Sequence, residues 1–188
     1  SGGRFGSSYH YIVDTDRVLP AVYEDIVAYA AAGANSDGVH ICFPGKAGQT
    51  RAQWLDTNSL AMINQCAQVM RDIALWNGIP LERLLDSQIR DGEWGYCDHW
   101  AISRVYNRSD HTDVGGSFPW DVLAGLLREA GNVSESFEFF NNPNPGSHFY
   151  DSRLPAPGDK LDPGVPRTIP VPGGTGKVGA MITVTATE

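Results

Sequence analysis

The stretch that constrains the fold most is Gly95–Asp121, with the sequence GYCDHWAISRVYNRSDHTDVGGSFPWD. It places His99, His111 and Asp113 within 15 residues, in a setting rich in Gly, Ser and Asn that is typical of a loop. Imidazole nitrogen and carboxylate oxygen are ligands that zinc accepts, and a catalytic zinc site uses three protein ligands. The alternative is a surface loop with two unrelated histidines, because the chain contains neither HExxH nor CxxC.

The residues that follow Asp113 predict a sharp turn and then a helix. Gly115 and Gly116 allow the backbone to turn beside a metal, and Ser117 can cap a helix whose first turn contains Pro119. The apolar stripe of that helix consists of Val122, Leu123, Leu126 and Leu127.

Several segments resemble one enzyme family. HTDVGGSFPWD resembles the TDPGxxFPWD ending of zinc-dependent N-acetylmuramoyl-L-alanine amidases of the peptidoglycan-recognition type, with Val114 where proline is usual. His99 in DHWAIS matches the histidine of the family's GHxDI segment. SYHYIVD at 8–14 resembles the strand SxHYxVD, and GVHICFPG at 38–45 resembles the strand SIGIELVG. The resemblance covers roughly residues 7–131, and the order of its pieces is similar to that of phage endolysins.

The pieces together predict an α/β fold with a central mixed β-sheet flanked by helices. The amidase-like catalytic domain is expected at 1–133, and a Pro/Gly-rich extension or linker at 134–188. Residues 141–179 hold 8 of the 12 prolines and 7 of the 21 glycines, which favours an extended linker or a wrapping tail. The β-prone segment MITVTAT at 181–187 must pair with the main domain or a partner, because an isolated strand is unstable in water. We expect residues 141–188 to be dispensable for catalysis.

Periodicity and turn signals locate the other elements. Strands are expected at 9–13, 17–22 and 39–43, a short alanine-rich helix at 24–32 closed by Gly33, and a helix or strand at 81–89. Thr50 and Gln53 fit a capping box before a long amphipathic helix that ends at Gly78.

The resemblance implies a role for each candidate site residue. His99 and Asp113 match metal-ligand positions for zinc, and His111 sits where relatives have a group that steadies the tetrahedral intermediate. Tyr9 matches the catalytic tyrosine of small phage amidases. His40 is expected on the strand face beside the zinc and is a further catalytic candidate. It shares that face with Cys42, which stands where many relatives hold a catalytic Glu.

A third zinc ligand is missing from the matched positions. In the family this ligand is a histidine on a strand a few tens of residues before SYHYIVD, and no histidine precedes Tyr9 here. Either His40 or His10 takes this place, or the chain is a fragment that lacks the first strand of the domain. We expect the fragment, in which an upstream segment of the same protein, joined or separately bound, completes the site.

The function implied by the resemblance is zinc-dependent hydrolysis of the amide between N-acetylmuramic acid and L-alanine in bacterial peptidoglycan, as in a phage endolysin. No secretory signal is visible in SGGRFGSS, so the enzyme would be made in the host cytoplasm and act on the cell wall. A net charge of −8 argues against a nucleic-acid partner. No apolar run approaches the ~18 residues of a membrane span.

Two other classes of function stay open. The same scaffold also occurs as receptors that bind muropeptide without cutting it, so a non-catalytic peptidoglycan-binding module is one alternative. The other is a cysteine hydrolase that uses Cys97 or Cys42 with His99, although a nucleophilic cysteine needs an adjacent, oriented base.

Overall fold

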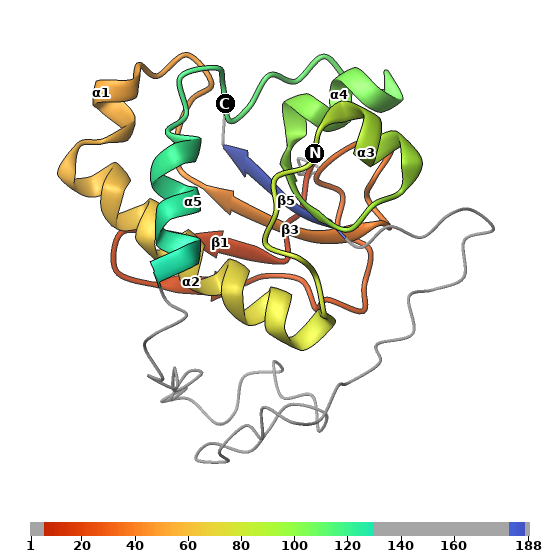
Figure 1. Cartoon of the computed structure of the whole chain (residues 1–188), viewed down its shortest axis with the longest axis horizontal. Helices are drawn as coiled ribbons and strands as arrows, with labels where there is room; N and C mark the ends of the chain where they lie inside the picture. The colour runs from red at the N-terminus through yellow and green to blue at the C-terminus, as the bar shows by residue number, and fades with distance from the viewer. Residues whose placement is uncertain (1–5, 130–180, 187–188) are drawn as a thin grey trace, which may run out of the picture.

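A five-stranded mixed sheet lies at the centre of the computed structural model, which describes residues 6–129 and 181–186 (Figure 1). The strands are β1 (Tyr11–Val13), β2 (Val18–Pro20), β3 (Gly38–Phe43), β4 (Gly95–Asp98) and β5 (Met181–Ala186). Their order in the sheet is β2-β1-β3-β5-β4, and every neighbouring pair is parallel except the β1–β2 hairpin. The predicted fold class, a central mixed sheet flanked by helices, is confirmed.

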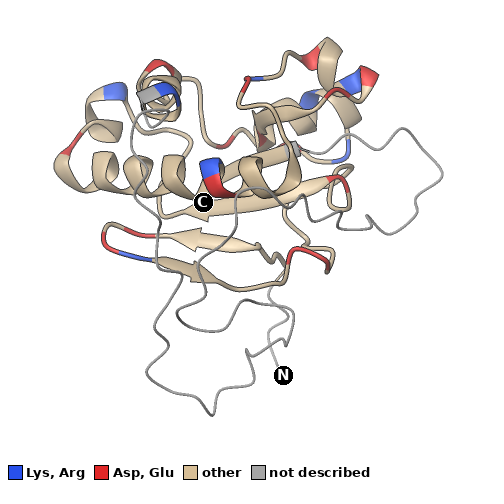
Figure 2. Cartoon of the chain, turned by 60° about the horizontal axis from the view of Figure 1, so that its bottom comes forward, with Lys and Arg blue, Asp and Glu red and all other residues tan. Residues whose placement is uncertain are grey.

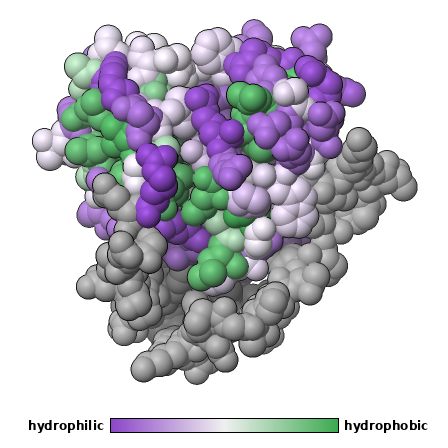
Figure 3. All heavy atoms as spheres, viewed as in Figure 1, coloured by the Kyte–Doolittle hydropathy of each residue, from purple (hydrophilic) through white to green (hydrophobic). Residues whose placement is uncertain are grey.

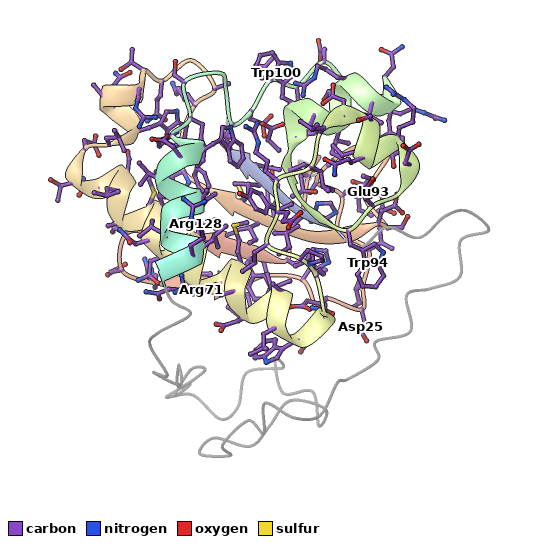
Figure 4. All side chains as sticks on the ribbon, in the orientation of Figure 1. Asp25, Arg71, Glu93, Trp94, Trp100 and Arg128 are labelled. Atoms are coloured by element: carbon purple, nitrogen blue, oxygen red, sulfur yellow. The ribbon has the colours of Figure 1, made fainter. Side chains whose placement is uncertain are left out.

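Two helices cover the more apolar face of the sheet. The helices within the described residues are α1 (Arg51–Trp54), α2 (Thr57–Asn77), α3 (Asp86–Asp91), α4 (His99–Tyr106) and α5 (Trp120–Glu129). α2 and α5 pack side by side, and Arg71 of α2 donates a hydrogen bond to the Leu126 carbonyl oxygen of α5 (3.0 Å). Figure 4 labels Arg71 and Arg128 along this helix pair. The core between these helices and the sheet includes Ile41, Phe43, Ile63, Met70, Leu123, Ile182 and Val184.

The opposite face of the sheet is more polar and lies toward α3 and α4. Side chains alternate between faces along a strand, and in-register neighbours share a face. His40, Thr183 and Cys97 therefore form one row across β3, β5 and β4, with the ring of His10 stacked on that of His40. A smaller apolar cluster lies beside this row and includes Ala101 and Ile102 of α4 together with Cys97 of β4.

Several local predictions agree with the structure. The hairpin lies within the predicted strands, and β3 contains the predicted run 39–43. Thr50 and Gln53 form the capping box, but it caps the short helix α1, and the long helix α2 has its own cap at Asp56. Gly78 ends α2 with a left-handed φ of 68°. The helix α5 begins at Trp120, so Pro119 directly precedes it instead of lying in its first turn. A short helix, α3, occurs at the end of the segment predicted as helix or strand.

The predicted helix at 24–32 is wrong. This segment is a loop, because its backbone groups bond to side chains and backbone outside it. Asn35 Oδ1 accepts from the Ala30 and Ala31 N–H groups, and Ser8 Oγ accepts from the Tyr29 N–H. These bonds replace the helical ladder that the alanine content favours.

The β-prone segment near the end of the sequence pairs with the main domain, as expected of a strand that cannot stand alone. β5 is an interior strand of the sheet, in parallel register with β3 on one side and β4 on the other. Residues 182–186 are buried. One strand of the predicted extension therefore belongs to the same sheet as the strands of residues 1–133. The Pro/Gly-rich part at 141–179 lies outside the described residues.

Charged residues lie mainly on the helices and loops, and β4 alone among the strands carries one, at its end, Asp98 (Figure 2). On the face shown in Figure 3, hydrophobic residues are interrupted by hydrophilic ones instead of forming one continuous apolar surface. Within residues 6–129 and 181–186, no helix has the length and apolar character needed to cross a membrane.

Candidate functional site

The N-terminus of α4 positions His99. Asp98 caps this helix, because its side chain accepts a hydrogen bond from the Ala101 N–H (2.6 Å), so His99 is the first helical residue and not part of a loop. The next residue, Trp100, donates its backbone N–H to the Asp113 carbonyl oxygen (2.9 Å). Figure 4 labels Trp100 at this end of α4. This bond ties the loop after α4 back to the start of the helix.

Three side chains converge at this point. The Nδ1 atoms of His99 and His111 lie 3.3 Å and 3.7 Å from the same atom, Asp113 Oδ1. The two imidazole rings are stacked, with centroids 4.5 Å apart. One ligand atom from each of the three residues lies within 4.8 Å of the others, and in the described part of the chain this is the group that could hold a metal ion.

The geometry around Asp113 Oδ1 fits a zinc ion. This buried oxygen faces the Nδ1 atoms of both imidazoles and has no further partner among the described residues. Zinc ligands about 2.0–2.1 Å from a tetrahedral ion lie roughly 3.3 Å from one another. The separations of 3.3 Å and 3.7 Å are close to that value. Two nitrogens and one carboxylate oxygen are a donor set that zinc accepts.

Asp113 is fixed as an anion by its surroundings. Burial alone would raise the pKa of this carboxyl, but the hydrogen bond and charge from His99, and the N–H of Ala186, together hold the pKa below its usual value. The Ala186 N–H donates to Oδ2 (3.1 Å), which leaves Oδ1 directed at the histidines. One oxygen of the Asp113 carboxylate is thus held by a hydrogen bond, and the other is available to bind a metal ion.

A cavity of about 400 Å³ opens beside the cluster. Its lining consists of Gly6, Ser7, Tyr9, Tyr29, Ala30, Ala31, Ala32, Asn35, His99, Ser109, His111, Asp113 and Ala186. Tyr9 is half-buried in this wall, and burial raises the pKa of its hydroxyl. The hydroxyl of Tyr9 therefore stays protonated at neutral pH and can donate a hydrogen bond into the cavity.

The other two predicted histidines, His10 and His40, are buried in the sheet and do not line the cavity. His10 uses both ring nitrogens, since Nε2 lies 3.0 Å from the Ile26 carbonyl oxygen and Nδ1 accepts the His40 backbone N–H. His40 Nε2 lies 3.2 Å from the Asn35 carbonyl oxygen. The structure therefore brings His99, His111 and Asp113 together with Tyr9, and it places His10 and His40 behind the cavity wall.

The cysteines are poorly suited to be nucleophiles. Cys42, Cys66 and Cys97 are all buried. Burial raises the pKa of the Cys42 and Cys97 thiols above the ordinary value, which disfavours the reactive thiolate. The geometry thus gives no support to a cysteine hydrolase.

Sequence reasoning missed two contributors to the site. The first is the segment 29–32, which lines the cavity as a loop although a helix was predicted there. The second is the Ala186 N–H, because no local sequence signal places its strand next to Asp113. The β-prone character of MITVTAT indicated a strand but not its place in the sheet.

Comparisons with known proteins agree with this geometry. In fold, the chain is similar to the Staphylococcus aureus hydrolase AmiA, whose crystal structure was solved in complex with its ligand, with a TM-score of 0.51 and 22% identity. The likeness covers 65% of this chain and 58% of that chain, so this chain spans less than two thirds of AmiA. No curated protein matches the chain. A family model described as N-acetylmuramoyl-L-alanine amidase matches residues 2–116, which include Tyr9 and all three residues of the metal cluster. The chain belongs to the N-acetylmuramoyl-L-alanine amidase family.

Proposed function

We propose that this protein hydrolyses the amide between N-acetylmuramic acid and L-alanine in bacterial peptidoglycan, in a zinc-dependent reaction. The observation that carries the proposal is the convergence of His99, His111 and Asp113 on one point at the edge of a cavity. Family membership supports the choice of bond. The resemblance of the motifs to phage endolysins supports the further proposal that the protein is made in a host cytoplasm and acts on the cell wall.

His99 and Asp113 would hold the zinc, with His111 as the third ligand. The resemblance gives His111 a different role, stabilisation of the tetrahedral intermediate, but its Nδ1 approaches the same Asp113 oxygen as that of His99. Most catalytic zinc sites use three protein ligands. A histidine from an upstream segment, the completion expected from the resemblance, is therefore not required for a set of three.

Zinc bound at this site would supply a nucleophile near neutral pH and polarise a carbonyl group. Tyr9 on the cavity wall can assist, because its protonated hydroxyl can donate a hydrogen bond to the oxygen on which negative charge develops. The Ala186 N–H keeps the Asp113 carboxylate oriented. His40 lies outside the cavity, so we assign it no contact with the substrate.

Purified cell wall provides the test. The protein should release soluble muropeptides that carry new L-alanine amino termini, a chelator should stop the release, and added zinc should restore it. A thiol alkylator should have no effect, because the cysteines are buried. Zinc and wall binding without new L-alanine amino termini would instead identify a peptidoglycan-binding module. Loss of activity on alkylation, with no effect of the chelator, would indicate a cysteine enzyme.

A further inference from the structure

One wall of the cavity is a loop that has no helical or strand ladder of its own. Tyr29, Ala30, Ala31, Ala32 and Asn35 all lie in it and line the same cavity as the metal cluster. The Tyr29 side chain is 68% exposed, while Ala30 and Ala31 are buried. The position of this wall sets the width of the space available to a ligand.

Bonds to neighbouring segments hold the middle of the wall. The Ser8 N–H donates to the Tyr29 carbonyl oxygen (3.0 Å), and the Tyr29 N–H donates to Ser8 Oγ (2.9 Å). Asn35 Oδ1 accepts the N–H groups of Ala30 and Ala31 at 3.0 Å and 2.8 Å. Asn35 therefore links the end of the wall to its centre.

Two stacked histidines hold the ends of the wall. His10 Nε2 lies 3.0 Å from the Ile26 carbonyl oxygen, and His40 Nε2 lies 3.2 Å from the Asn35 carbonyl oxygen. Their rings are stacked with centroids 5.4 Å apart and an interplanar angle of 17°. Both side chains are almost completely buried, at 1% and 0% exposure.

The hydrogen bonds define the protonation state of the pair. His10 Nδ1 accepts the His40 backbone N–H (2.9 Å), so it carries no proton, and Nε2–H must be the donor to Ile26. A carbonyl oxygen can only accept, so His40 Nε2 also carries a proton. Burial lowers the pKa of both rings, which keeps them neutral.

We propose that His10 and His40 are positioning residues that clamp the two ends of the Ile26–Asn35 wall and thereby set how tightly the cavity binds the muropeptide. This inference rests on the proposed function for the identity of the ligand, but the clamp itself rests only on the contacts of His10 and His40 with the wall and with each other. Neither histidine touches the ligand or the metal. Their effect is exerted through the backbone at Ile26 and through Asn35.

Amide substitutions at His40 separate the clamp from simple burial. His40→Gln places an amide N–H near the position of Nε2, within reach of the Asn35 carbonyl oxygen, whereas His40→Asn places it near Nδ1 and loses that bond. We expect His40→Asn to raise KM and the Kd for N-acetylmuramoyl-L-alanyl-D-isoglutamine by roughly tenfold, the effect of one lost hydrogen bond. kcat and the zinc content should stay within about twofold of wild type. His40→Gln should restore KM and Kd.

Hydrogen exchange tests the clamp without reference to activity. The amides of Tyr29, Ala30 and Ala31 should exchange roughly tenfold faster in His40→Asn than in wild type or His40→Gln, with the amides of α2 unchanged. Ile63→Val, which weakens the core on the other face of the sheet, is the control and should leave both KM and the wall amides unchanged.

Other results for the His40 variants would overturn the clamp or the proposed function. Loss of zinc or of kcat in both amide variants would overturn the proposal and make His40 a ligand or a catalytic group. Unchanged wall exchange and unchanged Kd in His40→Asn would also overturn it. If wild type neither binds nor cleaves the muropeptide, the proposed function fails, and the exchange data alone decide whether the clamp exists.

Discussion

The backbone N–H of Ala186 donates a hydrogen bond to Oδ2 of Asp113 across 3.1 Å, although 73 positions separate these residues in the chain. Asp113 is a candidate metal ligand, and Ala186 ends β5, an interior strand of the sheet. Loss of a group that orients a metal ligand typically weakens metal binding by about 10–100-fold. β5 therefore belongs to the candidate site as well as to the fold.

Substitution of Ala186 by proline removes this donor. We expect Ala186→Pro to weaken zinc binding by about 10–100-fold, a typical effect of losing a group that orients a ligand. Ala186→Ser retains the N–H and should bind zinc as wild type does. Titration with a competing chelator measures both affinities, and equal affinities would show that the bond to Asp113 is dispensable.

Removal of residues 181–188 tests the sequence-based expectation that the region 141–188 is dispensable for catalysis. The position of β5 leads us to expect the opposite, because its deletion leaves β3 and β4 without their shared neighbour. We expect loss of both zinc binding and cooperative unfolding, measured by chelator titration and circular dichroism. A truncated chain that folds and cleaves peptidoglycan would support the earlier expectation.

Replacement of a single metal ligand tests the composition of the cluster. His99→Ala and His111→Ala should each abolish tight zinc binding and amidase activity while leaving far-ultraviolet circular dichroism unchanged, because the core on the other face of the sheet does not include either side chain. Metal analysis of the purified variants measures this. Full zinc content in His111→Ala would return His111 to the role of stabilising the intermediate.

Tyr9→Phe removes the hydroxyl but keeps the ring. Because the raised pKa keeps this group a donor at neutral pH, we expect kcat to fall by roughly 10²-fold or more while KM changes little. Steady-state kinetics on a soluble muropeptide measures both constants. An unchanged kcat would leave Tyr9 with a packing role.

Gly115 lies two residues after Asp113, at a φ of 93°. A Cβ atom added at Gly115 would clash with the backbone carbonyl oxygen of Ala47. A backbone atom cannot rotate away as the end of a flexible side chain can. Gly115→Ala should therefore lower the free energy of unfolding by about 1–3 kcal/mol. Urea unfolding measures it, and Gly48→Ala, where a Cβ meets nothing within 4 Å, is the control.

Acid should destabilise the fold through His40. Burial, and then the neighbouring His10, lowers the pKa of His40 to about 4 in the folded chain, against 6.5 ordinarily. The unfolded chain therefore binds a proton in this interval that the folded chain does not. The stability contribution is complete above pH 6.5 and is lost as the pH falls toward 4, by about 3 kcal/mol. Urea unfolding at pH 7 and pH 4.5 should show a smaller difference in His40→Gln than in wild type.

Short-range signals predicted much of this molecule. The spacing of His99, His111 and Asp113 indicated the cluster, since a single residue separates His111 from Asp113. The capping box at Thr50 and the left-handed end of α2 at Gly78 follow from local backbone chemistry. Asp98 is a further local signal, because an aspartate directly before an amphipathic segment favours the N-cap of a helix, here α4.

Long-range pairing could not be predicted in the same way. Nothing in MITVTAT specifies β3 and β4 as its neighbours, because any β-branched segment can fill a buried parallel position. The helix expected at 24–32 failed because Ser8 and Asn35 bond to its backbone, and these partners are recognised only once the chain is folded. His10 and His40 resembled ligands because their side chains alone do not reveal that the nitrogens are bonded to backbone carbonyl groups.

The interior position of β5 also determines the order of events during synthesis. A ribosome that has completed α5 has made every candidate zinc ligand, but it has not yet made the strand that joins β3 to β4. Contacts of such high sequence separation form late and slowly, because a long loop must close before they contribute. A nascent chain should therefore carry the ligands of an amidase without the assembled centre, and activity should appear only after residue 186 has left the exit tunnel.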